Sequence, residues 1–311
     1  ASCIIDGLPW NWETFGEYLA AVEQLPRGLN AGGYVGDVAL RMYVCGDASC
    51  EDDFRATPEQ LDDMAQLVEQ SMEDGALGYS ISRSLFHRVP DGRNVPGTWS
   101  EPEEFYAIAA PLGRLGRGVL ESAPRYNLPN VPGDRVEEEL AWMAEISRRT
   151  GRPFCFNLQQ VSSLGDHYRR VIELSEQANA TGAQLRPQMT PRSVGVLFSL
   201  DGNSLIDDLP SFQPYKDAPL ADKVAALRDP EVRARLLEEG ADKAFAGMYL
   251  MPADAPASYA HTPEESMAGI AAARGVSPVE AYIDELVRTD GRSVVNWPVM
   301  NQEHDAIEHM V

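Results

Sequence analysis

Hydrophobic positions between residues 30 and 190 follow two alternating spacings. Short apolar runs, rich in β-branched and aromatic residues, predict strands over residues 31–35, 76–82, 118–122, 153–159 and 184–189. The stretches between most of these runs have apolar residues three and four positions apart, as on one face of an amphipathic helix. Strands that alternate with helices in this way are typical of a parallel sheet built from repeated βα units.

The predicted helix that begins at Pro58 has the clearest start. Thr57 can cap it, Pro58 suits the first helical position, and Met64, Val68 and Met72 lie on one face. Further helices are expected over residues 101–115, 134–150 and 166–181. A glycine, which favours a left-handed helix end, follows each of the four: Gly75, Gly116, Gly151 and Gly182. These repeated junctions predict a βα barrel or a doubly wound sheet.

The regular alternation ends after Pro191. Residues 200–219 are rich in Asp, Pro, Gly and Ser, which predicts a long loop or an insertion. Helices are expected over 220–239, 263–274 and 278–289, followed by an apolar run over 294–299 and a helical turn from Glu303. We therefore expect a βα-repeat barrel part over 1–199, a loop and helical insertion over 200–292, and a return to the barrel over 293–311.

Charge and composition exclude several classes of partner. The net charge is -22, with 26 Lys and Arg against 48 Asp and Glu, so nucleic acids and anionic membranes are repelled. No apolar run is long enough to span a membrane, and the first residues do not resemble a signal peptide. The four cysteines form no C-x-x-C pair, so reduced thiols are expected. We predict a cytoplasmic protein without nucleic-acid or membrane partners.

Polar residues at the ends of the predicted strands are the candidates for chemistry, because parallel βα folds place their sites at the carboxyl ends of strands. The candidates are Asp37, Ser82, Arg83, Glu121, Arg125, Asn157, Gln159, Gln160, Gln188 and Arg192, with His87 in the loop after the second strand. We expect Ser82, Arg83, His87, Asn157, Gln159 and Arg192 to bind substrate.

Glu121 is the candidate catalytic residue and metal ligand. It follows apolar Val119 and Leu120, and a carboxylate that emerges from a buried strand can act as a base or a ligand. A helix cap or a salt bridge is an equally ordinary role for it. Arg83 and Arg192 suit a substrate carboxylate, although structural ion pairs explain them equally well. No H-x-H, H-E-x-x-H, G-x-S-x-G or P-loop motif occurs, so spacing alone names no reaction.

Several stretches in combination resemble one family. They read GLPWNWETFGEYL at 7–19, VGDVALR at 35–41, GALGYSISR at 75–83 with His87 and Arg88 after it, PQMTPR at 187–192 and LRDPEVR at 227–233. With them the chain resembles the N-acyl-D-amino-acid deacylases of the amidohydrolase superfamily. The resemblance implies a (β/α)8 barrel, a zinc cofactor, and hydrolysis of linear amides such as N-acyl-D-amino acids by metal-activated water.

The resemblance covers the middle of such a barrel. The family's H-x-H-x-D motif and its later aspartate are expected outside this chain, and Glu121 and Asn157 stand where deacylases have metal-binding histidines on the middle strands. The chain could be part of a full enzyme, one subunit of a split enzyme, or a relative without catalysis that serves as a scaffold or binding subunit. We expect a homo-oligomer, or a barrel completed by residues outside this chain.

Overall fold

A computed structural model describes residues 10–26, 28–126, 135–161, 164–256, 259 and 261–311. The chain divides into two compact units, Ala1–Met189 with Met310–Val311, and Thr190–His309. The predicted divisions after residues 199 and 292 stay predictions. Asp134, the expected first residue of one helix, lies outside the described residues.

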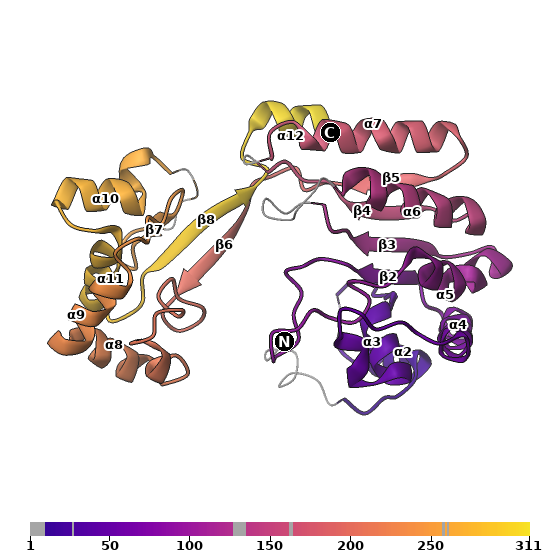
Figure 1. The fold of residues 1–311 in the computed structure, drawn as a ribbon, viewed down its shortest axis with the longest axis horizontal. Helices are drawn as coiled ribbons and strands as arrows, with labels where there is room; N and C mark the ends of the chain where they lie inside the picture. Colours follow the sequence, from indigo (N-terminus) through magenta and orange to yellow (C-terminus); the bar gives the residue numbers. More distant parts are fainter. Residues whose placement is uncertain (1–9, 27, 127–134, 162–163, 257–258, 260) are drawn as a thin grey trace. The chain divides into compact units, whose positions relative to one another are not determined.

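The first unit contains a five-stranded parallel sheet in the order β1-β2-β3-β4-β5 (Figure 1). Its strands are β1 (Val35–Gly36), β2 (Gly78–Ser82), β3 (Val119–Ala123), β4 (Phe154–Asn157) and β5 (Leu185–Gln188). The prediction of a parallel βα sheet is confirmed. The first strand differs from the expected 31–35, because β1 has two residues and Asp37 already begins a helix.

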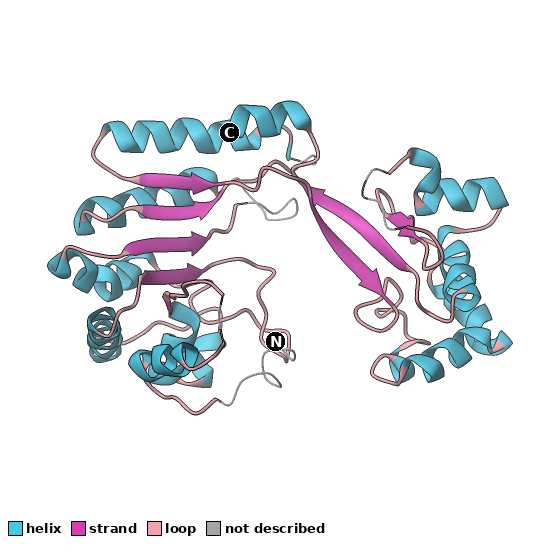
Figure 2. Ribbon diagram, turned by 180° about the vertical axis from the view of Figure 1, so that it is seen from behind, coloured by secondary structure: helices cyan, strands magenta, loops and turns pink. Residues whose placement is uncertain are grey.

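The helices of the first unit pack against one face of this sheet (Figure 2). The expected helices are α4 (Pro58–Glu73), α5 (Pro102–Leu115), α6 (Val136–Thr150) and α7 (His167–Ala180). Sequence reasoning missed α2 (Phe15–Glu23), α3 (Asp37–Cys45) and the 3-10 turn η1 (Asp47–Cys50). The core lies between the sheet and helices α4 to α7, where the ring of Trp142 contacts Phe105 in a tilted arrangement and Phe154 edge-on, each with centroids 5.4 Å apart.

Local chemistry sets the ends of these elements. Thr57 and Gln60 form a capping box at the start of α4, and Gly116 and Gly151 end α5 and α6 in the left-handed conformation. Gly78 allows β2 to approach β3, since a Cβ atom there would lie 1.8 Å from the carbonyl oxygen of Val119. A side chain at residue 78 would therefore separate β2 from β3.

The second unit contains an antiparallel sheet in the order β6-β8-β7. Its strands are β6 (Val194–Ser199), β7 (Tyr249–Met251) and β8 (Val294–Met300). Its helices are α8 (Leu220–Arg228), α9 (Pro230–Glu239), α10 (Met267–Arg274), α11 (Pro278–Arg288) and α12 (His304–Met310), with 3-10 turns η3 (Gln213–Tyr215) and η4 (Pro263–Glu265). Sequence reasoning missed β6 and β7. β8 coincides with the expected apolar run and pairs with both strands of this sheet.

Two predictions about the second unit are refined. The single helix expected over 220–239 is two helices, because Pro230 has no backbone N–H to continue α8 and instead starts α9 under the cap of Asp229. The expected loop over 200–219 carries core residues, since Leu205, Ile206 and Phe212 are buried in the hydrophobic cluster of this unit.

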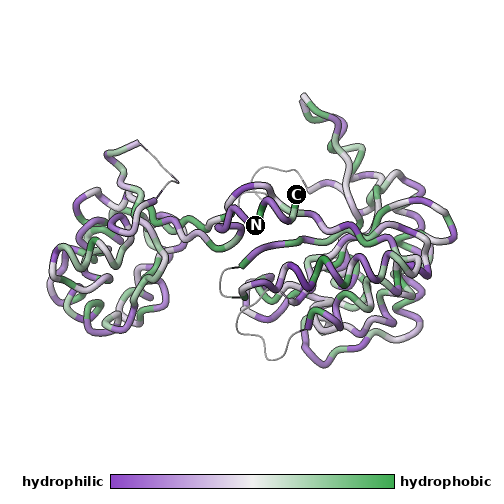
Figure 3. Tube along the Cα trace, turned by 90° about the horizontal axis from the view of Figure 1, so that it is seen from above, coloured by the Kyte–Doolittle hydropathy of each residue, from purple (hydrophilic) through white to green (hydrophobic). Residues whose placement is uncertain are grey.

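Hydrophobic and hydrophilic positions are interleaved along both units (Figure 3). Among the described residues, no helix combines the length and the apolar character that crossing a membrane requires.

Candidate active site on the open sheet face

The two faces of the five-stranded sheet differ in burial and chemistry. Side chains alternate between faces along a strand, and Tyr79, Leu120 and Phe154 are buried toward the helices. The alternate positions are half-buried or exposed, and we call this side the open face. The residues of β2 to β5 that it carries are Ser80, Ser82, Val119, Glu121, Ala123, Cys155, Asn157, Arg186 and Gln188.

One row of the open face is polar across four strands. Ser80 is in register with Glu121, Glu121 with Cys155, and Cys155 with Arg186. Neighbouring strands lie about 4.8 Å apart, so Glu121 and Arg186 are about 10 Å apart along the row, with Cys155 between them. Sequence reasoning passed over Arg186, although the alternation with buried Leu185 in β5 was a signal for it.

The side chains of this row influence one another electrostatically. Burial raises the pKa of Cys155, the Glu121 carboxylate raises it further, and Arg186 lowers it. Burial and then the charges of Glu121 and Cys155 also raise the pKa of Tyr34, which immediately precedes β1. Glu121, Cys155 and Arg186 therefore form one polar row, and the charges of Glu121 and Cys155 also act on Tyr34.

A second row lies at the carboxyl ends of the strands, where we expected the site. Ser82 is in register with Ala123, and Asn157 is in register with Gln188. Ser82 Oγ lies 2.5 Å from Nδ1 of His87, in the loop after β2. The structure thus brings the predicted residues Ser82, His87 and Asn157 to one end of the sheet, with Glu121 one row deeper.

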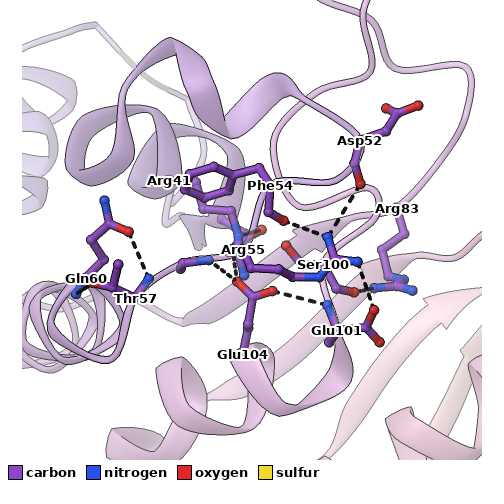
Figure 4. A network of polar contacts seen from close by, with 12 residues as sticks. Arg41, Asp52, Phe54, Arg55, Thr57, Gln60, Arg83, Ser100, Glu101 and Glu104 are labelled. Carbon is purple, nitrogen blue, oxygen red and sulfur yellow. Dashed lines mark hydrogen bonds and ion pairs between the residues drawn. The ribbon is translucent and has the colours of Figure 1, made fainter.

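Arg83 points away from this site, contrary to its predicted role. It is 1% exposed, pairs with Glu139 at 3.2 Å and donates to the backbone oxygen of Ser100 at 2.8 Å (Figure 4). Its guanidinium also lies over the ring of Phe105. Because the guanidinium is buried and paired, we do not retain Arg83 as a substrate ligand; it anchors the segment that leads into α5.

Asp37 also belongs to the helical side rather than to the open face. It forms a buried ion pair with Arg41 at 2.9 Å, and Arg41 pairs with Glu104 at 2.8 Å. Tyr79 donates a hydrogen bond to Asp37, and burial together with the Asp37 charge raises the pKa of Tyr79. Gly97 makes room for this cluster, since a Cβ atom there would lie 2.2 Å from the Asp37 carboxylate.

Four other candidates lie elsewhere. Arg192 is exposed in the second unit, where its guanidinium donates to the backbone oxygen of Ser193 at 3.1 Å. Gln159 is half-buried two residues after β4, and Gln160 is buried beside it. Arg125 is buried and pairs with Glu139 at 3.1 Å, so it shares the ion-pair network of Arg83.

The open face offers an incomplete set of metal ligands. Glu121 and Cys155 are a carboxylate and a thiol on neighbouring strands, whereas a catalytic zinc takes three protein ligands. Within the described ranges, His, Cys, Asp and Glu side chains form no group of three that could hold a metal ion. Glu121 and Cys155 therefore do not fit a zinc site on their own.

The model of the amidohydrolase family matches residues 4–299, most of the chain. This protein belongs to the amidohydrolase family. An uncharacterized protein of Mycobacterium tuberculosis is 28% identical over 319 residues, which cover 94% of this chain and 49% of that relative. The D-aminoacylase of Alcaligenes xylosoxydans xylosoxydans is 31% identical over 111 residues, 36% of this chain and 20% of that enzyme.

Solved structures of D-aminoacylase share the amidohydrolase fold seen here. One, described for its binuclear metal center, has a TM-score of 0.51 and 20% identity and covers 95% of this chain and 48% of that chain. Another has a TM-score of 0.51 at 18% identity. The chain spans about half the length of the mycobacterial relative and of these D-aminoacylase structures, and its parallel sheet has the partial-barrel form that was predicted.

Proposed function

We propose that this amidohydrolase cleaves the amide bond of N-acylated amino acids on the open face, with N-acyl-D-amino acids as the first class to test. The observation that carries the proposal is the polar row Ser80, Glu121, Cys155 and Arg186 beneath the carboxyl ends of the strands. The similarity to D-aminoacylase supports the substrate class.

Arg186 and Glu121 have distinct roles in this proposal. Arg186 binds the substrate carboxylate, since its guanidinium is the cation of the open face and can form two parallel hydrogen bonds. The spacing of about 10 Å then places the amide near Glu121, two strands across the sheet. Glu121 accepts a proton from the attacking water, the work of a general base.

Zinc remains part of the proposal by similarity alone. One D-aminoacylase structure is known for a binuclear metal center, and such a metal would polarise the substrate carbonyl. In this chain, Glu121 and Cys155 are the open-face side chains that could contribute to such a site.

The test is turnover by the full-length natural protein. N-acetyl-D-amino acids and their L forms are supplied, and the released amine is quantified, with metal content measured on the same sample. We expect Glu121→Gln to lower kcat about 100-fold or more, the usual range for a lost general base. Arg186→Gln should mainly raise KM. Glu176→Gln, on the exposed side of α7, is the matched control and should leave both constants unchanged.

Unchanged turnover in Glu121→Gln would exclude Glu121 from the chemistry. A protein that folds, binds N-acyl-D-amino acids and hydrolyses none would favour the alternative expected from the sequence, a scaffold or binding subunit derived from an amidohydrolase.

A further inference from the structure

The first unit contains a cavity of about 450 Å³ beside β1. Its lining comes from the start of α2, from β1, and from α3 and α4, with buried Val35 and Leu40 among its apolar residues. Pockets that bind small molecules measure about 300 to 1,000 Å³ and are mostly apolar, with a few polar groups. The cavity therefore suits a small molecule, and neither Glu121 nor Arg186 of the proposed site lines it.

Aromatic rings make up much of this lining. They belong to five residues from the start of α2, the segment before β1, and α3: Trp12, Phe15, Tyr18, Tyr34 and Tyr43. The ring centroids of Trp12 and Tyr18 are 5.5 Å apart, and those of Phe15 and Tyr18 are 5.6 Å apart. Aromatic rings carry negative charge on their faces, so a cavity walled by several rings attracts a cation.

The charged side chains of the lining have the complementary sign for a cation. Among the described residues that line the cavity, Glu13 and Asp74 are the charged ones, and both are acidic. A positively charged ligand would therefore meet two carboxylates in this lining and no positive side chain, whereas an anion would be repelled.

The contact between α2 and the end of α4 sets the position of Asp74. Gly16 makes this contact possible, since a Cβ atom at residue 16 would lie 3.0 Å from the Asp74 carboxylate carbon. The Gln70 side-chain amide donates to the Asp74 carboxylate at 3.0 Å and orients it. The Glu17 carboxylate is engaged in the capping box of α2, so Glu13 is the acidic residue that the start of this helix supplies to the cavity.

We propose that this cavity binds a small organic cation with a quaternary ammonium group, such as trimethylammonium. A quaternary ammonium group has no N–H donor, so the rings and the apolar residues Val35 and Leu40 can surround it without leaving a donor unpaired. Glu13 and Asp74 supply the balancing negative charge. The binding is independent of amide hydrolysis, so it does not rest on the proposed function.

Choline and a neutral isostere test the role of the positive charge. The isostere is the alcohol in which a carbon atom replaces the choline nitrogen, so the two molecules share one shape. Both are titrated into the full-length natural protein by isothermal titration calorimetry. We expect saturable choline binding with a Kd of about 1 mM or lower, and binding of the neutral alcohol at least about tenfold weaker.

Variants connect the binding with this cavity. Trp12→Ala should weaken choline binding at least about tenfold. The double variant Glu13→Gln with Asp74→Asn should do the same, and it keeps the shapes of both side chains. Tyr259→Ala removes an exposed aromatic ring of the second unit and is the matched control, which should bind choline like the natural protein. Circular dichroism checks that each variant is folded.

Several results would overturn the inference. Equal binding of choline and the neutral alcohol would show that the charge is not recognised. Unchanged binding in both cavity variants would indicate loose attraction of cations to the acidic surface instead. Absence of saturable choline binding would exclude the site, and sedimentation with phosphatidylcholine vesicles in that case would indicate a membrane headgroup rather than a free ligand.

Discussion

The pKa of Cys155 depends on the two charged side chains beside it on the open face. Cys155 lies between Glu121 and Arg186 in one row, and these two charges act on its pKa in opposite directions. Burial is the largest cause of the raised pKa, so the thiol stays protonated at neutral pH and reacts slowly.

The charge of Glu121 can be removed to test this arrangement. In Glu121→Gln the pKa of Cys155 should fall, so that more thiolate is present at pH 8 and alkylation by iodoacetamide becomes about two to ten times faster. Arg186→Gln should slow the same reaction. Peptide mass spectrometry follows Cys155, and Cys45, whose pKa responds to Arg41, Glu104 and Asp37 instead, is the internal control. Equal alkylation rates in the natural protein, Glu121→Gln and Arg186→Gln would show that these two charges do not influence the Cys155 thiol.

The start of helix α4 shows how much a single element depends on local chemistry. Thr57 accepts a hydrogen bond from the Gln60 amide, and the Gln60 side chain accepts one from the Thr57 amide. The helix then buries Met64 and Val68 against the core. The cap therefore fixes where α4 begins, after the loop that follows η1.

Thr57→Ala should lower the free energy of unfolding by about 1 kcal/mol, the usual effect of losing an N-cap hydroxyl. Urea denaturation followed by circular dichroism measures the change. Thr57→Ser keeps the hydroxyl and should stay close to the natural protein. If both variants lose the same amount, packing of the Thr57 methyl group matters more than the cap.

At the scale of the whole molecule, two separate cores stabilise the chain. The core of the second unit contains Phe212, Leu227 and Tyr282, all buried within Thr190–His309. The core of the first unit lies between its sheet and helices α4 to α7. In the first unit, β1 and β5 are the sheet's edge strands, so completion by residues outside this chain or by a second copy stays a prediction.

Each core should respond to its own mutation. Phe212→Ala removes a fully buried ring and should destabilise the second unit by about 3 to 5 kcal/mol. Hydrogen exchange measured by mass spectrometry should show lost protection in residues 190–309 and unchanged protection in β2 to β5. Phe154→Ala is the reciprocal control and should affect the first unit. Loss of protection in both units from either variant would indicate one cooperative structure.

Local patterns in the sequence determined much of the first unit. The spacing of apolar residues, the Thr57 cap and the glycines after the helices predicted α4 to α7 and strands β2 to β5, because each of these signals acts within a few residues. The same patterns predicted Ser82, Glu121 and Asn157 at strand ends. Ser82 and Asn157 do end β2 and β4, whereas Glu121 lies in the middle of β3. Together with the family motifs, these patterns predicted a partial amidohydrolase barrel.

Only the tertiary structure decided which polar residues face the site. The alternation along a strand separates the neighbours Ser82 and Arg83, but only the tertiary structure pairs Arg83 with Glu139, 56 residues away. Likewise β6 and β8 pair although about 100 residues separate them along the chain. β7 has three residues, too few for a pattern that would predict a strand, and it forms by pairing with β8. Such long-range pairings form where burial and hydrogen bonding become favourable in the folded chain, and sequence spacing alone does not contain them.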